Sequence, residues 1–178
     1  MTHLGLAFEV VESAFEETEA GADPRGLALA NALGKGRLVA RQGHPLVLGA
    51  DTVVTIDGTS LGSPTDEQEA ALMLDQLSGR AHTVMTALAL LCDGRESSAV
   101  VESEVTFRSL SPIMIAWYVA TGEWRGRAGG YAIQGAGAAI VADIQGDLSN
   151  VIGLPVGALL DLLAAVGIAP WSKLTVQG

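Results

Sequence analysis

The sequence is most informative at residues 46–56, which read Leu46-Val47-Leu48-Gly49-Ala50-Asp51-Thr52-Val53-Val54-Thr55-Ile56. The first five residues form a short apolar run, which is typical of a β-strand that is buried on both faces. Asp51 follows this run directly, and the extended pattern continues from Thr52 to a turn at Asp57-Gly58. Open α/β sheets place ligand-facing groups at strand ends, so Asp51 is a candidate to hold Mg²⁺ or to take a proton from water. The alternative is a plain Asx turn before Thr52.

Helix and strand signals alternate on both sides of this stretch. Upstream, Phe8 to Val11 predicts a strand, and Asp23-Pro24 predicts the start of a helix that ends near Arg41. Downstream, a capping-box pattern at Thr65-Asp66-Glu67-Gln68 opens a helix to Leu77. The remaining predictions are strands at 83–91 and 96–107 joined by a hairpin turn, a helix from 111 to 122, a glycine-rich loop at 126–137, a strand at 138–141 and a helix at 156–166. This order predicts a mixed α/β fold, with residues 1–178 forming a single domain.

Composition excludes several classes of protein. The chain has 178 residues, of which 49% are hydrophobic and 17% charged, so it can bury a substantial core. Its 20 acidic and 10 basic side chains give a net charge of −10, which argues against a nucleic-acid binder or an anionic-membrane binder. Pro155 and Asp161 interrupt the most apolar stretch, so we expect no membrane span. The lone Cys92 excludes an internal disulfide framework, which fits a reducing, cytoplasmic location.

An acidic protein that binds an anionic ligand needs a local group of cations or a metal ion. The candidate cations are scattered along the chain, at Lys35, Arg37, Arg80 and Arg108. They could converge on phosphate oxygens, and the alternative is that each is a separate solvated charge.

The segment Arg127-Ala128-Gly129-Gly130-Tyr131-Ala132-Ile133-Gln134-Gly135 is the most unusual in composition. Its glycines would let the backbone approach a ligand closely, and the amide of Gln134 offers both a donor and an acceptor to a base edge. The alternative is a loop that needs glycine only for positive φ angles. The segment lacks the Gly-Lys-Ser/Thr of a P-loop, and the chain has no Gly-x-Ser-x-Gly elbow.

Several motifs occur in an order that covers nearly the whole chain: Leu48-Gly49-Ala50-Asp51-Thr52-Val53-Val54, Leu61-Gly62-Ser63-Pro64, Met73 to His82, Phe107 to Ser111, Thr121-Gly122-Glu123, Ala128 to Gly135 and Val151-Ile152-Gly153-Leu154-Pro155. This series resembles the Maf family of nucleoside triphosphate pyrophosphatases, first named as septum-formation inhibitors. The resemblance implies an elongated α/β fold with a central cleft, akin to inosine triphosphatase-type enzymes, and often a homodimer. It implies hydrolysis of a nucleoside triphosphate to the monophosphate and pyrophosphate with a divalent metal ion, Mg²⁺ or Mn²⁺.

The resemblance also implies roles for individual residues. Asp51 falls on the proton acceptor, which would also hold the metal, and Lys35 falls on a phosphate-binding lysine. Thr52 and Gln134 fall on positions tied to base selection, and Ala50-Asp51-Thr52 is similar to the subgroup that acts on dTTP and UTP. Physically, Arg80 would help Lys35 to offset the charge of a triphosphate.

Two departures from the family pattern affect the expected activity. The resemblance implies that family members begin with a strand and a Ser-x-Ser-Pro-Arg-Arg turn, and it aligns Met1 after both. Either the start was assigned at an internal Met, or the protein is truly truncated. Ser63 stands in the substrate-binding position where the family has the lysine of Gly-Lys-Pro. Loss of these cations predicts weakened activity, and the alternative function is a catalytically weak or inactive Maf-like protein that acts by binding, for example in cell division.

Overall fold

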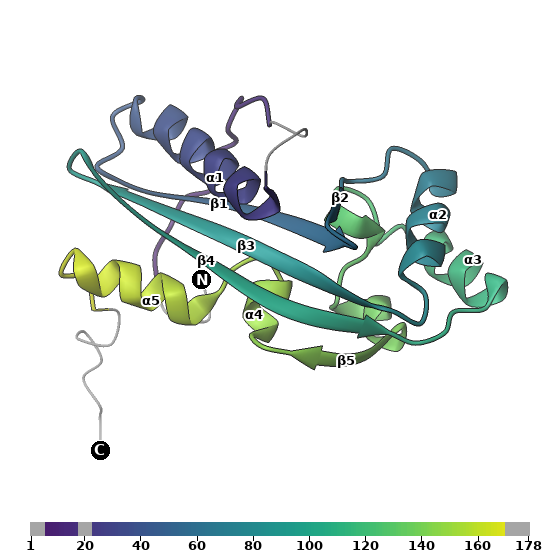
Figure 1. Ribbon diagram of the computed structural model, residues 1–178. Helices are drawn as coiled ribbons and strands as arrows, with labels where there is room; N and C mark the ends of the chain where they lie inside the picture. Colours follow the sequence, from purple (N-terminus) through teal and green to yellow (C-terminus); the bar gives the residue numbers. More distant parts are fainter. Residues whose placement is uncertain (1–5, 18–22, 170–178) are drawn as a thin grey trace, which may run out of the picture.

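The computed structural model describes residues 6–17 and 23–169, which form one twisted sheet with helices on both faces (Figure 1). The strands are β1 (Leu46–Ile56), β2 (Thr59–Leu61), β3 (Ala81–Cys92), β4 (Arg95–Phe107) and β5 (Val141–Gln145). Their order in the sheet is β2-β1-β3-β4-β5, and every neighbouring pair is antiparallel. The predicted mixed α/β class is confirmed.

The helices are α1 (Pro24–Ala40), α2 (Glu67–Leu77), α3 (Pro112–Thr121), α4 (Leu148–Val151) and α5 (Val156–Ala165), together with two 3₁₀ turns, η2 (Ala128–Gly130) and η3 (Gly135–Ala139). Helix α1 covers one face of the long strands, and α4 and α5 cover the other (Figure 1). Helices α2 and α3 lie at the end of the sheet near β2 (Figure 1). Among the described helices, none combines the length and apolar character needed to cross a membrane.

Strand β1 is buried on both faces, as its apolar run predicts. Val47 and Val53 pack against α1, in a cluster that includes Leu27. Leu48 and Ala50 point to the opposite face and pack in the cluster around α5. The alternation follows from the two-residue period of a strand, which sends neighbouring side chains to opposite faces. The two faces of β1 therefore belong to two different hydrophobic clusters.

A third cluster fills the end of the sheet near α2 and α3. It continues from Val54 of β1 to Leu74 of α2, Tyr118 of α3 and the buried Trp124. Strand β3 contributes to all three clusters, which makes the long β3–β4 hairpin the common support of the molecule.

Local signals account for most of the element boundaries. The Asp23 side chain accepts a hydrogen bond from the Gly26 amide at the start of α1, and Ser111 caps α3 in the same way. The two hairpin turns place Asp57-Gly58 and Asp93-Gly94 at positive φ, which is the conformation of a type I′ turn.

Three local predictions were wrong. Residues 8–11 are not in a strand, and the side chains of Phe8 and Val10 are exposed, so this segment builds no buried face. The strand expected at 138–141 begins only at Val141, because residues 135–139 form η3. Helix α2 is capped by Asp66 rather than Thr65; the Glu69 amide donates to Asp66, and the Glu69 carboxylate accepts from Thr65.

Helix α1 approaches β1 closely because both carry glycine at the crossing. A Cβ atom at Gly49 would collide with the carbonyl oxygen of Ala32 and would lie 2.9 Å from the amide nitrogen of Gly36. The absence of a side chain therefore lets the two backbones come into contact. This contact places the neighbouring side chains Asn31 and Lys35 of α1 over Asp51.

Candidate active site

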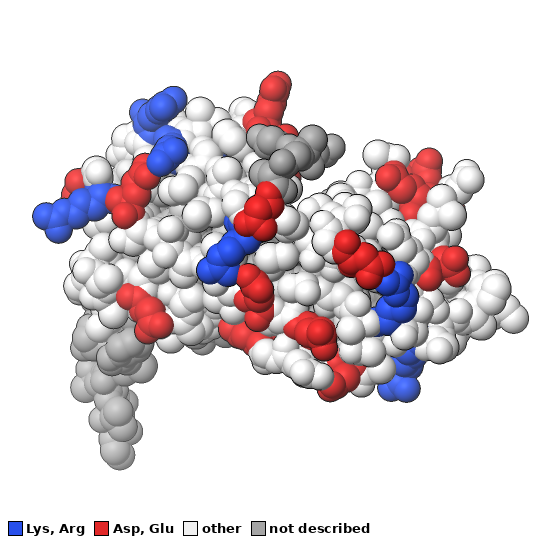
Figure 2. Space-filling view, viewed as in Figure 1, with Lys and Arg blue, Asp and Glu red and all other residues white. Residues whose placement is uncertain are grey.

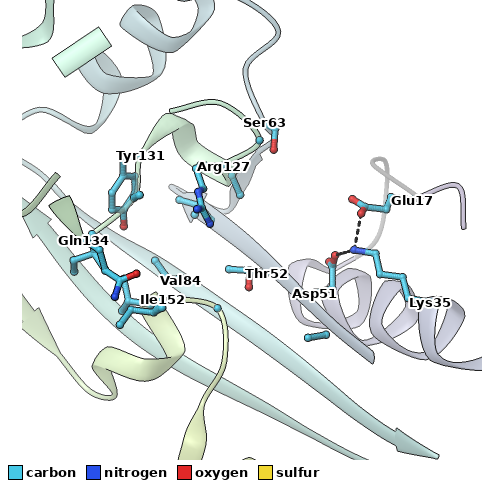
Figure 3. Close-up of a pocket in the computed structure, with 18 residues that line it drawn as sticks. Glu17, Lys35, Asp51, Thr52, Ser63, Val84, Arg127, Tyr131, Gln134 and Ile152 are labelled. Atoms are coloured by element: carbon cyan, nitrogen blue, oxygen red, sulfur yellow. Dashed lines mark hydrogen bonds and ion pairs between the residues drawn. The ribbon is translucent and has the colours of Figure 1, made fainter. Parts of the chain in front are cut away.

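A cavity of about 360 Å³ opens where α1, β1 and the glycine-rich loop meet (Figure 3). Its lining includes four residues predicted from the sequence besides Asp51, namely Lys35, Thr52, Ser63 and Gln134. Lys35 and Asp51 lie at one end and Gln134 at the other, with Thr52 between them (Figure 3). The fold thus gathers residues that lie up to 99 positions apart in the sequence.

Asp51 lies in the middle of β1, where it pairs with Ala87 of β3. It does not stand at a strand end, and the extended pairing on both sides excludes an Asx turn. The carboxylate is 8% exposed; its Oδ1 accepts from Lys35 Nζ at 2.6 Å and its Oδ2 from Asn31 Nδ2 at 3.3 Å. Asp51 lines the cavity together with Lys35, although two side chains of α1 cover most of its carboxylate.

The ammonium group of Lys35 lies between two carboxylates. Its Nζ is 2.6 Å from Asp51 Oδ1 and 2.5 Å from Glu17 Oε1 (Figure 3). Burial acts to lower the pKa of Lys35, but the hydrogen bonds and charges of Asp51 and Glu17 outweigh it, so the pKa is raised. Lys35 is therefore a permanent cation in this site.

Burial raises the pKa of the Asp51 carboxyl above its usual range, and the Lys35 ammonium acts in the opposite direction. A carboxylate whose pKa is raised is a stronger base. A general base also works most efficiently when its pKa lies close to the working pH. The geometry and the protonation of Asp51 thus both suit a general base.

Thr52 points to the opposite face of β1 from Asp51 and is held by a buried polar network. Its Oγ1 lies 2.9 Å from Thr86 Oγ1, and Thr86 donates to the carbonyl oxygen of Asn150 at 3.0 Å. The Asn150 side chain is fully buried and bonds to the backbone of Thr86 and Val84 and to the hydroxyl of Ser103. This network fixes both Thr52 and the adjoining wall at residues 151–153.

The glycine-rich loop forms the remaining wall of the cavity. Gly129, Gly130 and Gly135 all have positive φ angles, so the loop needs glycine for its turns and also lines the site. Gln134 is exposed to the cavity near Ile152 (Figure 3). The hydroxyl of Tyr131 lies 2.8 Å from Nε2 of the buried His82.

Arg80 does not line this cavity. Its Nη2 pairs with Asp57 Oδ2 at 2.6 Å on the surface, and Arg37 likewise pairs with Glu96. Figure 2 shows the same tendency, with basic side chains next to acidic ones on this face. Arg37 is two residues from Lys35, a rotation of about 200° around a helix, so the two side chains leave α1 in different directions.

Two residues of the site were not singled out from the sequence. Arg127 begins the glycine-rich segment 127–135 and lines the cavity, but the sequence pattern indicated no function for its cationic side chain. Asn150 follows no strand or loop signal, and only its tertiary contacts reveal that it supports the cavity. Among the described residues, no group of three or more His, Cys, Asp or Glu gathers at one point.

Known proteins resemble this chain over most of its length. A family model described as Maf-like protein matches residues 1–166. A protein of Deinococcus radiodurans is 41% identical over 94% of this chain and 86% of its own length. Relatives from Gloeobacter violaceus and Moorella thermoacetica are 45% and 44% identical, over 92% and 97% of this chain and 87% and 91% of their own lengths. All three relatives are named dTTP/UTP pyrophosphatase.

Proposed function

The chain belongs to the Maf family, and on this premise we propose that it is a nucleoside triphosphate pyrophosphatase acting on dTTP and UTP. One observation carries the proposal: the buried Asp51 lies 2.6 Å from Lys35 at one end of a cavity whose other end holds Gln134. Such a cavity has a base and a cation for the phosphates and an amide for the nucleobase.

In this reaction Asp51 takes a proton from a water molecule as the water oxygen bonds to the α-phosphorus. The bond between that phosphorus and the bridging oxygen breaks, and pyrophosphate leaves with the bonding electrons. Lys35 offsets part of the negative charge, which matters because positioning and charge stabilisation supply most of the catalysis in phosphoryl transfer.

A divalent cation, Mg²⁺ or Mn²⁺, is part of the proposal. Asp51 and Glu17 already approach one ammonium group from two sides, so both carboxylates are placed to hold a cation. Mg²⁺ commonly binds through one or two carboxylates together with substrate phosphates, so this donor set fits. When bound, the metal would neutralise phosphate charge.

Thr52 and Gln134 are proposed to select the base. The 2,4-dioxo edge shared by thymine and uracil presents an N–H donor beside carbonyl acceptors, and a single amide side chain can satisfy one of each. Ser63 lines the same cavity and would add a hydroxyl contact to the substrate. Homodimer formation stays a prediction.

The first test measures pyrophosphate release from dTTP, UTP and GTP with Mg²⁺ or Mn²⁺. We expect dTTP and UTP to be preferred, and Asp51→Asn to lower kcat by about 10²–10⁴ because the general base is lost. Asp161→Asn is a matched control, since Asp161 is exposed on α5 and lies outside the cavity.

The outcomes separate the competing functions. Wild-type turnover that Asp51→Asn leaves intact would contradict the mechanism. If the wild-type protein releases no pyrophosphate above background, the hydrolase proposal is wrong and a Maf-like protein that acts by binding is favoured.

A further inference from the structure

Arg127 is the cation of the cavity that no described acidic group neutralises. It lines the cavity from the start of η2, and its guanidinium points toward the space between Tyr131 and Thr52 (Figure 3). Its backbone is fixed on both sides, because its amide donates to Trp124 and its carbonyl accepts from Gly130. Within residues 6–17 and 23–169, no hydrogen bond or ion pair engages its side chain.

The charge of the cavity depends on this side chain. Four charged side chains line it in the described part of the chain, the cations Lys35 and Arg127 and the carboxylates Glu17 and Asp51. Both carboxylates pair with Lys35, so these three side chains together carry a net charge of −1. Without Arg127 the lining would be net negative, which would repel a polyphosphate.

The loop that carries Arg127 is tied to the loop that carries Ser63. The amide of Gly129 donates to the carbonyl oxygen of Gly62 at 3.0 Å. In Figure 3, Arg127 lies between the end marked by Gln134 and the end marked by Lys35. A nucleotide whose base meets Gln134 and whose reacting phosphate meets Asp51 would occupy the cavity that Arg127 also lines.

We propose that Arg127 binds the phosphate chain of the nucleotide and supplies a cation on the wall where Ser63 offers only a hydroxyl; this rests on the function proposed above. The guanidinium is planar and presents parallel N–H donors, which suits two oxygens of one phosphate or of neighbouring phosphates. Because its side chain is held by no other described group, it can bind substrate without first breaking an ion pair.

The test compares two neighbouring arginines. Arg127→Ala should lower kcat/KM for dTTP by about 10²–10³, the typical loss when one charge-assisted contact to a reacting group is removed. Arg125→Ala makes the same change in net charge two residues away. Arg125 stacks over Trp124 at 4.7 Å, lies 3.8 Å from Glu67 and does not line the cavity, so this variant should stay within about threefold of the wild type.

A second variant tests the location of the charge. Adding Ser63→Lys to Arg127→Ala places a cation on the tethered neighbouring loop, and we expect at least tenfold recovery of kcat/KM. A purely structural role for Arg127 would not be rescued from position 63. Thermal unfolding of each variant shows whether any loss of activity comes from loss of folding.

Isothermal titration calorimetry tests whether Arg127 binds phosphate without requiring catalytic turnover. Pyrophosphate and dTMP should bind at least tenfold more weakly to Arg127→Ala than to Arg125→Ala, whereas thymidine, which has no phosphate, should bind both equally. Equal binding of pyrophosphate to the two variants would overturn the proposal. Absent pyrophosphate release by the wild type would instead overturn the hydrolase function, and the two failures are therefore distinguishable.

Discussion

At the scale of single residues, burial controls the protonation of groups that the cavity depends on. Asp51 and Lys35 form a pair in which the acid is the more buried partner, with side chains 7% and 23% exposed. Burial favours the neutral acid, and the ammonium favours the carboxylate. The Lys35 ammonium therefore keeps the Asp51 carboxylate ionised at pH values where burial alone would keep it protonated.

His82 predicts a pH dependence of stability. It is 3% exposed, it contacts the rings of Phe107 and Tyr131 edge-on, and burial lowers its pKa from 6.5 to about 4. Below pH 6.5 the unfolded chain binds a proton at this residue that the native chain does not bind until about pH 4. The free energy of unfolding therefore falls as the pH drops from 6.5 to about 4, by about 3 kcal/mol in total.

Urea unfolding between pH 7 and pH 4.5 measures this effect. The free energy of unfolding should fall less steeply with pH in His82→Gln than in the wild type, because the buried imidazole is gone. His44→Gln, at a half-buried position after α1, should keep the wild-type slope. Equal slopes in the wild type and His82→Gln would show that His82 is not held neutral.

At the scale of elements, the crossing of α1 over β1 sets the distance between Lys35 and Asp51. Gly49→Ala would drive a methyl group into the backbone of Ala32, and we expect it to destabilise the protein by about 1–3 kcal/mol and to lower activity. Gly157→Ala is the control, because Gly157 lies on the exposed side of α5 with open space around it. That change should be neutral or stabilising by up to about 1 kcal/mol, since alanine favours a helix. Thermal unfolding distinguishes the two glycines, and equal midpoints would contradict the close crossing.

The elements could be predicted where the signal is local. Asp23-Pro24, Ser111-Pro112 and the Asp-Gly turns act within a few residues, so their helices and hairpins were placed correctly. Side-chain direction is not local: Arg80 pairs with Asp57 on the surface, whereas Arg127 points into the cavity. The support that Asn150 gives to Thr52 passes through β3, and no spacing in the sequence indicates such a contact.

At the scale of the whole molecule, the β3–β4 hairpin joins three hydrophobic clusters into one unit. Val84, Leu88 and Leu91 of β3 each belong to a different cluster, so one cluster cannot lose its packing without disturbing the strand the others share. We therefore expect the described fold to unfold in a single cooperative transition.

Trp124 is the probe for this expectation, because it is buried in the cluster at the α2–α3 end, and its indole donates to Val119. In a variant with Trp117 and Trp171 replaced by Phe, its fluorescence and the far-ultraviolet circular dichroism should give the same midpoint. Gly49→Ala, at the contact between β1 and the backbone of α1, should lower both midpoints equally. A fluorescence midpoint that Gly49→Ala leaves unchanged would show that the two ends unfold separately.

The alternation of β1 has one more consequence. Asp51 and Thr52 are consecutive, yet one faces α1 and the other faces the Asn150 network, so the acid and the hydroxyl lie on the two sides of a single strand. A residue gained or lost between Gly49 and Asp51 would exchange these sides while leaving the composition of the motif intact. The register of β1 against its neighbouring strands therefore matters to the proposed reaction as much as the identity of its side chains. Insertions and deletions are compatible with that reaction only outside β1.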